Sequence, residues 1–466
     1  MSHYTYGDPM RERSPWQPRL SSNATSPTEQ LVEALAEDIL SGSLQHGARL
    51  PAHRNLADTL GIGLGTVTKA YGILEKRGLV RSVKGSGMFV ALANSRGQTV
   101  IDLSQNTPPA ALSSRSLSAT LSAIARRPDM DMFNTYAPAA GHDEHRRLMA
   151  RWFNRLGMPA DYRQLIITSG AQHALSVALS TVCEPFGTLY VEAQTYSGLI
   201  QLSRLLKLRL VGIPMDDEGM DVSVLEKMLD ASDDKRSAVY VTPLLQSPST
   251  RIMSLARRKD LIRVCRANAL FIIEDDVYRL TRNIELPQIA RLAPDITLYV
   301  NSLSKILNPT LRIGGLLLPE QLYSRAESML RATAMMVSPI SCAIMEQWLL
   351  DGTAETVTSA IEHETIRRYE LAFSILGEHL YRSGHPSFHL WLPLARESVQ
   401  PFYEAALAAG IKVTSPVSTE VNPLSEQSGI RLCIGGPEIE QLHRALLTLK
   451  EIAGQLKRPR VQTFSV

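Results

Sequence analysis

The sequence predicts a winged helix-turn-helix unit followed by a larger α/β domain, whose mostly parallel sheet leads into a small α+β subdomain near the C-terminus. Two patterns support this fold class. Three short segments with helical periodicity precede two short strands near the N-terminus, and from about residue 143 apolar runs of strand length alternate with segments of helix length. The chain has 466 residues, 44% of them hydrophobic, which suggests two to four domains with sizeable cores.

The composition excludes several classes of protein. The formal charge is only +3, so a basic binding surface has to be local. The four cysteines stand far apart without a CxxC pair, and no histidines cluster at metal-ligand spacing, so we expect no metal site, no disulfide framework and a cytoplasmic location. No segment approaches the roughly 18 apolar residues of a membrane span. Residues 1–24 are polar and are expected to be a flexible N-terminus.

The first expected unit covers residues 25–92. Ser26, Pro27 and Glu29 form a capping box before the apolar face of the first helix. Two further helical segments, "RLPAHRNLADTLG" and "GLGTVTKAYGILEKRG", end in the glycines that favour helix termination. The strand-like segments "LVRSV" and "GMFVAL" flank the turn sequence "KGSG", which predicts a hairpin.

These N-terminal segments together resemble the GntR-type winged helix, a bacterial DNA-binding domain. Seven basic and two acidic residues lie between positions 49 and 84, a local charge of +5 that suits the phosphates of a double-stranded DNA operator. The resemblance implies that Arg54, Thr66, Thr68 and Lys69 face DNA, with Lys84 and Gly87 at the wing tip near the minor groove.

The turn before the expected recognition helix reads "GIGLGTV" and departs from the GntR pattern. Relatives usually carry Ser or Thr, Arg, and Asn or Thr at positions 63, 64 and 65. Leu64 cannot bond a base edge, so we expect fewer direct base contacts or a lower affinity per half-site. A helix-turn-helix that serves only as a protein-interaction module is the alternative.

A stretch rich in Ser, Pro, Asn and Thr follows, and we expect a linker at residues 93–115. Beyond it, the runs "LIITSG", "TLYVEA", "AVYVTP", "LFIIEDD", "ITLYVNS" and "IGGLLLP" read as strands of βαβ units. The stretch from "FHLWLPLA" onward, with "GIKVTSP" and "GIRLCIG", reads as the small α+β subdomain.

Chemically capable residues follow several of these strands, where open α/β sheets place their ligands. "TSGAQHAL" brings small residues to the start of a helix, "IIEDDVY" carries Asp275 and Tyr278, and "SLSK" carries Lys305. A phosphate cup, a carboxylate, a phenol and a lysine are the groups that pyridoxal phosphate requires. A coincidental α/β domain with these residues in unrelated roles is the alternative.

Residues 100 to 455 resemble the fold-type I aminotransferases in the order and spacing of these residues, and we expect the aminotransferase-like domain proper at 116–455. The resemblance implies that Lys305 bonds covalently to pyridoxal phosphate, Asp275 pairs with the pyridine nitrogen and Tyr278 hydrogen-bonds the ring hydroxyl. It also implies that the phosphate is held by Ser302, Ser304, Arg312, Ala171 and Gln172.

Four further positions take roles from the same resemblance. Tyr196 is similar to the aromatic residue that stacks on the cofactor ring, and Tyr136 to the tyrosine that reaches the phosphate from a partner subunit, which implies a homodimer. Arg431 matches the arginine that grips the α-carboxylate of an amino acid. Ser247, in "QSPSTR", stands where these enzymes usually carry the asparagine that assists the phenol at the ring hydroxyl.

A GntR-type domain joined to an aminotransferase-like domain points to the MocR subfamily of bacterial regulators. We therefore expect a regulator that senses an amino acid, an amine or pyridoxal phosphate itself. Two alternatives remain: an active aminotransferase with an accessory or vestigial DNA-binding domain, and a regulator that responds to the cofactor alone. Retention of Arg431 argues mildly against the last of these.

Overall fold

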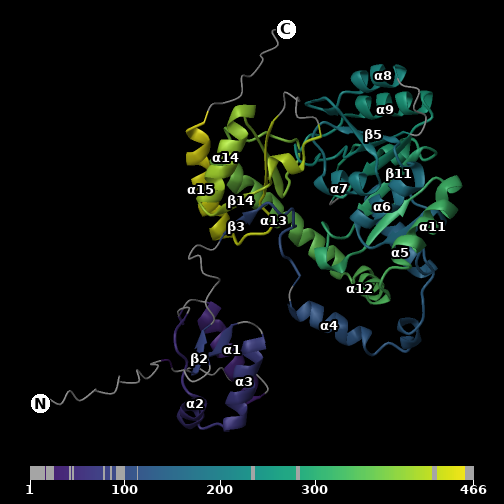
Figure 1. Cartoon of the computed structure of the whole chain (residues 1–466). Coiled ribbons are helices and arrows are strands. Elements are labelled where there is room, and N and C mark those ends of the chain that lie inside the picture. Colours follow the sequence, from purple (N-terminus) through teal and green to yellow (C-terminus); the bar gives the residue numbers. More distant parts are fainter. Residues whose placement is uncertain are drawn as a thin grey trace, which may run out of the picture. The chain divides into compact units, whose positions relative to one another are not determined.

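The computed structural model describes residues 16, 26–40, 43–44, 47–76, 79–83, 87–90, 100–112, 114–231, 237–279, 284–421 and 428–456. The chain divides into two compact units, Met1–Thr99 and Val100–Val466, each shown in Figure 1. The flexible N-terminus expected at residues 1–24 lies, apart from residue 16, outside the described residues.

The first unit is a winged helix-turn-helix, as predicted. Its elements are α1 (Pro27–Leu40), α2 (His53–Leu60), α3 (Leu64–Lys76) and the antiparallel hairpin β1 (Val80–Val83) with β2 (Gly87–Val90). Apolar side chains at helical and strand spacing close one small core: Leu31, Leu35, Leu56, Val67, Tyr71, Leu74 and Val90. Residues 77–78 and 84–86, which include the expected helix stop and wing tip, lie outside the described residues.

The ends of the N-terminal helices are set by the residues expected to cap them. The Glu29 amide donates to Ser26 Oγ at 3.3 Å at the start of α1. Gly61 closes α2 in the left-handed conformation, with φ of 62°, and its amide returns to the carbonyls of Ala57 and Asp58. Only glycine adopts this conformation without a steric cost, so the turn into α3 depends on it.

The second unit contains a seven-stranded sheet in its larger lobe. The strand order is β4-β12-β11-β10-β9-β5-β6, and all pairs are parallel except those made by β12. The strands are β4 (Leu165–Thr168), β5 (Thr188–Glu192), β6 (Arg209–Ile213), β9 (Ala238–Val241), β10 (Phe271–Asp275), β11 (Thr297–Ser302) and β12 (Gly314–Leu317). The six expected strands are confirmed. Edge strand β6 was not predicted, because its half-exposed residues lack a buried apolar run.

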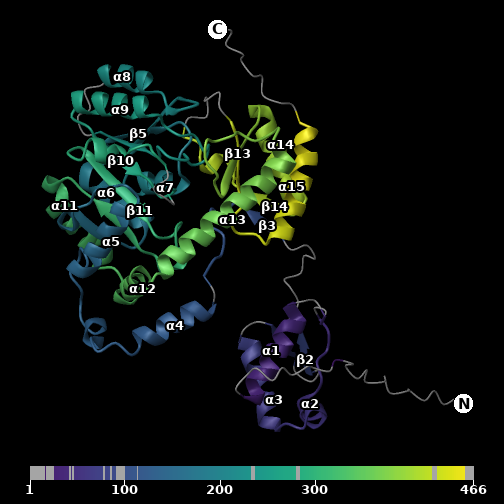
Figure 2. The same ribbon diagram turned by 180° about the vertical axis from the view of Figure 1, so that it is seen from behind.

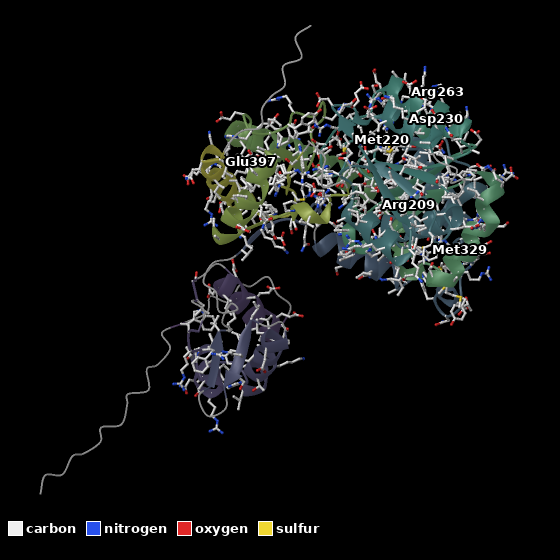
Figure 3. All side chains as sticks on the ribbon, turned by 45° about the horizontal axis from the view of Figure 1, so that its top comes forward. Arg209, Met220, Asp230, Arg263, Met329 and Glu397 are labelled. Carbon is white, nitrogen blue, oxygen red and sulfur yellow. The ribbon has the colours of Figure 1, made fainter. Side chains whose placement is uncertain are left out.

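Helices cover both faces of this sheet. Its two faces are buried under α6 (Ala171–Val182), α7 (Ser197–Leu205) and α11 (Tyr323–Ala334) on one side, and under α8 (Val222–Asp230), α9 (Leu255–Ala267) and α10 (Ile289–Leu292) on the other. Further core is added by α5 (Asp143–Arg155) and α12 (Pro339–Leu350), and α4 (Ser114–Ile124) lies against α12. Figure 3 shows Asp230 of α8 and Arg263 of α9 on the outer surface of this lobe.

The smaller lobe packs three helices on two short two-stranded sheets. The sheets pair β13 (His389–Pro393) with β15 (Gly429–Cys433) and β3 (Ile101–Leu103) with β14 (Ile411–Val413); the helices are α13 (Thr353–Leu376), α14 (Arg396–Ala408) and α15 (Ile439–Gly454). Figure 2 shows α13 running between the two lobes. The minor elements are strands β7 (Met215–Asp216) and β8 (Gly219–Met220) and short 3-10 helices at 130–133, 162–164, 309–311, 320–322 and 416–418.

The linker expected at residues 93–115 differs from the structure. From Val100 onward the chain belongs to the second unit, and Ile101–Leu103 forms β3, parallel to β14. The polar composition of the stretch hid this strand, because only Leu103 of β3 is fully buried. The first residues of the second unit are therefore part of the smaller lobe.

No single helix among the described residues is long and apolar enough to cross a membrane. One pair of helical segments, Glu320–Ala334 and Pro339–Leu350, passes by length and composition together, but it is bent by 119°.

Replacing Gly61 by alanine tests the turn between α2 and α3. Gly61→Ala should destabilise local structure there by about 1 kcal/mol, because alanine is strained at positive φ although no atom lies within 4 Å. Gly72→Ala, inside α3 with equally open surroundings, is the matched control and should be neutral or stabilising. Hydrogen exchange of peptides from α2 and α3 in the full-length protein measures both effects. Equal exchange in the two variants would contradict the assigned role of Gly61.

Candidate functional site

A cavity of about 250 Å³ lies at the carboxyl ends of strands β9, β10 and β11 and reaches the smaller lobe through Arg431. The sequence-predicted residues that line it are Ala171, Gln172, Tyr196, Ser247, Asp275, Tyr278, Ser302, Ser304, Lys305, Arg312 and Arg431. Lining residues that the sequence reasoning missed are Asn106, Thr107, Tyr240, Thr242, Val277 and Pro309. Tyr136 does not line the cavity and is 81% exposed.

Asp275 ends the buried strand β10 and presents a carboxylate with one free oxygen. Its Oδ2 accepts a hydrogen bond from Tyr240 Oη at 2.8 Å, whereas its buried Oδ1 has no partner among the described residues. Burial raises the pKa of Asp275 to about 6, although the Tyr240 hydrogen bond opposes this shift. An orphaned buried oxygen of this kind fits a ligand that brings an N–H donor, such as a protonated pyridine ring.

An anion cup lies at the N-terminus of α6. Arg312 Nη1 donates to Ser304 Oγ at 3.3 Å, and Ser302 Oγ lies 3.1 Å from Ser304 Oγ. A Cβ atom on Gly170 would lie 2.8 Å from Arg312 Nη2, so the helix begins this close to the guanidinium only because residue 170 is glycine. Unpaired amides at a helix start, hydroxyls and an arginine are the groups that hold a phosphate.

Lys305 follows β11 and points into the cavity, where its Nζ donates to the backbone carbonyl of Asn106. The pKa of Lys305 is lowered to about 8, mainly by burial; the charges of Arg431 and Arg312 act in the same direction, whereas Cys433 and Asp275 oppose them. The neutral, nucleophilic form of the amine is therefore easier to reach near pH 7 than in an ordinary lysine. An ordinary exposed lysine would be almost wholly protonated there.

Tyr278 has a partner at its hydroxyl that the sequence did not predict. Asn106 Nδ2 donates to Tyr278 Oη at 2.7 Å, and the His389 ring lies 4.6 Å from the Tyr278 ring, centroid to centroid. Burial raises the pKa of Tyr278, although Arg431 and Ser247 act in the opposite direction. Ser247 Oγ itself accepts a hydrogen bond from Arg431 Nη1 at 3.0 Å.

Arg431 is buried on β15 and contacts only uncharged oxygen atoms among the described residues. Its Nε donates to Thr414 Oγ1 at 3.2 Å and its Nη2 to the Ser104 carbonyl at 3.3 Å, beside the Ser247 contact. No described carboxylate lies within ion-pair distance of it, so its positive charge is available to an anionic ligand. The arrangement fits a carboxylate bound between the two lobes.

Asn106 and Tyr240 carried only weak signals in the sequence. Tyr240 is a polar-tipped residue inside an otherwise apolar strand, "AVYV", on the neighbour of the Asp275 strand. That pattern could have marked it as a second-strand partner of the carboxylate. Asn106 stands in a stretch expected to be a linker, and only the pairing of β3 with β14 brings it to the cavity.

The candidate DNA-contacting residues belong to the first unit. Arg54 on α2, Thr68 and Lys69 on α3 and Gly87 on β2 are exposed, and Thr66 is half-buried. Leu64 is 44% exposed at the first position of α3, and Thr68 Oγ1 donates to its carbonyl at 2.9 Å. Lys84 lies outside the described residues, so the wing-tip assignment stays a prediction.

Two family models match this chain. Residues 98–449 match the model for aminotransferase class I and II, and residues 27–90 match the model for bacterial regulatory proteins of the gntR family. The first match covers most of the second unit and the second covers the winged helix-turn-helix.

Two of the relatives are described as transcriptional regulators. The chain is 25% identical over 452 residues to YdeF of Bacillus subtilis, an uncharacterized HTH-type transcriptional regulator, covering 95% of this chain and 97% of that protein. It is 26% identical to PdxR of Corynebacterium glutamicum, an HTH-type pyridoxine biosynthesis transcriptional regulator, over 76% of this chain and 80% of that one. Its fold is similar to that of the kynurenine aminotransferase of Pyrococcus horikoshii solved with PMP, at a TM-score of 0.70 and 22% identity, over 78% and 92% of the two chains.

The pKa of Lys305 predicts how pH affects its reaction with an aldehyde. When pyridoxal phosphate is added, the rate at which a lysine-dependent absorbance band forms should rise as pH rises toward about 8 and then level off, because the neutral amine is the nucleophile. Stopped-flow absorbance across this pH range measures the rate. Lys305→Ala should fold, by circular dichroism, and form no band, whereas the surface variant Lys259→Ala should behave as wild type. A band that persists in Lys305→Ala would remove Lys305 from the site.

Proposed function

The chain belongs to the aminotransferase class I and II family and carries a gntR-family DNA-binding domain, and we propose that it is a transcriptional regulator that binds pyridoxal phosphate and senses an amino acid or amine. The observation that carries this proposal is the single cavity in which Lys305, Asp275, Tyr278, Arg312 and Arg431 meet. Asp275 and Tyr278 come from the end of β10, Lys305 and Arg312 from the segment after β11, and Arg431 from β15 of the smaller lobe, so three distant segments converge on the cavity.

Pyridoxal phosphate, when bound, supplies an aldehyde that combines with amines and an electron-withdrawing ring. The protein's residues would hold it at three points: Asp275 Oδ1 at the ring nitrogen, Tyr278 at the ring oxygen, and Arg312 with Ser302, Ser304 and the start of α6 at the phosphate. Tyr196 lines the same cavity and suits the face of the ring. Lys305, with its lowered pKa, supplies the amine.

Arg431 supports an effector that carries a carboxylate. Its charge has no described carboxylate partner within ion-pair distance, and it sits on the smaller lobe at the edge of the cavity. An amino acid would place its amine near Lys305 and its carboxylate at Arg431. An amine without a carboxylate, or the cofactor alone, would leave Arg431 on its present neutral partners.

The segment that enters the cavity from the N-terminal side offers a route from effector to DNA. The Lys305 amine donates to the carbonyl of Asn106, and the Arg431 guanidinium donates to the carbonyl of Ser104. Both acceptors follow β3, which begins at Ile101, shortly after residues 91–99 connect the winged domain to the second unit. An effector that binds Lys305 or Arg431 would break the hydrogen bond of that side chain to Asn106 or Ser104. The effector alters DNA affinity if that change has different free energies in the DNA-bound and free states.

A homodimer and a cytoplasmic location complete the proposal. Tyr136 is exposed, as expected of a residue that serves a partner's site, and the adjoining helices α4 and α12 expose Leu117, Leu121, Ile340 and Leu350. Exposed apolar residues gathered on neighbouring elements favour a protein contact. A DNA-binding regulator in a bacterium works in the cytoplasm.

Turnover as an aminotransferase is the second candidate, because the same cavity holds every group that the reaction would use. Lys305 has a pKa near neutrality for proton transfer, and Arg431 orients a carboxylate. Steady production of oxo acids from common amino acids would favour this candidate over a sensor.

The experiment that tests the regulator is binding of the purified protein to the DNA immediately upstream of its own gene, at fixed salt, with and without pyridoxal phosphate. Specific binding that changes with the cofactor is the expected result. Absence of specific binding in both conditions would make the basic surface a relic or an interaction module and would favour the enzyme.

Lys69 tests the assigned DNA surface. Lys69→Ala should weaken operator binding and reduce the slope of log affinity against log salt by about 1, since one phosphate contact is lost. Lys450→Ala, on the exposed side of α15 in the second unit, is the matched control and should leave the slope as it is. An unaltered slope in Lys69→Ala would remove Lys69 from the contact surface.

A further inference from the structure

Asn106 contacts two of the reactive side chains at once. Its Nδ2 donates to Tyr278 Oη at 2.7 Å, and its backbone carbonyl accepts from Lys305 Nζ. Its Oδ1 is buried and has no hydrogen-bond partner among the described residues. Leaving the buried Oδ1 of Asn106 without a partner costs free energy. The contact between Nδ2 and the phenol is kept in spite of that cost, which points to a function for it.

The contact with Tyr278 fixes where the phenol can donate. A phenolic oxygen that accepts from Asn106 has one proton of its own, and that proton is left to point away from the amide. Tyr278 lines the cavity, so the available direction includes the bound ligand. Asn106 therefore orients Tyr278 as a donor toward the cavity.

Ser247 is shared between Tyr278 and Arg431. In the aminotransferases that the chain resembles, an asparagine at the Ser247 position assists the phenol. Here the shorter Ser247 hydroxyl lowers the pKa of Tyr278 through a hydrogen bond and also accepts one from Arg431 Nη1 at 3.0 Å. The amide that reaches Tyr278 comes instead from the segment after β3, 172 residues away in the sequence.

We propose that Asn106 is the positioning residue for the ring hydroxyl of the cofactor: its side-chain amide acts through Tyr278 and compensates for the serine at position 247. The proposal rests on the proposed binding of pyridoxal phosphate. When pyridoxal phosphate is bound, Tyr278 held in this way would donate to its ring oxygen and stabilise negative charge there, which would lower the pKa of the neighbouring lysine-bound nitrogen. Loss of the amide weakens this donation.

The test is a pH titration of the absorbance of the lysine-bound cofactor in the full-length protein, without any substrate. The Asn106→Ala protein should still show the absorbance band, but the pH at the midpoint of the absorbance change should rise by about one unit. This is the size expected for a weakened hydrogen bond to a charged group. Asn106→Asp keeps the size of the side chain and replaces the donor by an acceptor, so it should also raise the midpoint; it reads the effect if the alanine variant fails to fold. Asn268→Ala, at the end of α9, is the matched control and should titrate as wild type.

A second substitution separates hydrogen bonding from packing. Asn106→Ala combined with Ser247→Asn should return the midpoint to within a few tenths of a unit of wild type, because an amide is then available beside Tyr278 from the other side. A wild-type midpoint in both Asn106→Ala and Asn106→Asp, or a raised midpoint that Ser247→Asn leaves unchanged, would overturn the role of Asn106. No band in the wild-type protein would instead overturn the proposed function itself.

Discussion

The buried carboxylate of Asp275 constrains the arrangement of the whole cavity. A carboxylate at the end of a central strand, with one oxygen satisfied by Tyr240 and the other unsatisfied, is unfavourable unless a ligand brings a donor. The strand order places Asp275 between the strands that deliver Tyr240 and Lys305, so the sheet sets their spacing. The other cavity residues surround the volume that such a ligand would fill.

The strands of the large sheet and the caps of the N-terminal helices were predictable, because they depend on short-range rules. Apolar runs of strand length identified all central strands of the sheet, and a serine and a glycine cap identified the start of α1 and the end of α2. Residues directly after those strands, such as Asp275 and Lys305, converge because carboxyl ends of parallel strands share one edge. Their positions after parallel strands, together with the resemblance to the aminotransferases, were enough to predict one shared site.

What the sequence did not reveal depends on contacts between distant segments. Asn106 has no recognisable motif, and its role exists only because β3 pairs with β14, more than 300 residues later in the chain. The position of Ser247 was predictable, but its contact with Arg431 was not, because that contact joins the two lobes. Local pattern finds residue types, whereas hydrogen-bond partners are decided by tertiary packing.

Helix α13 belongs to two hydrophobic cores at once. Val357 and Ile361 near its start pack with the larger lobe, and Ala372 and Leu376 near its end pack with the smaller lobe. At 24 residues it is about 36 Å long, and nothing in its sequence interrupts it. Both lobes therefore pack on one continuous helix. A closing movement over the cavity would have to turn about this helix or bend it, and the segment that carries Ser104 and Asn106 would turn with the smaller lobe.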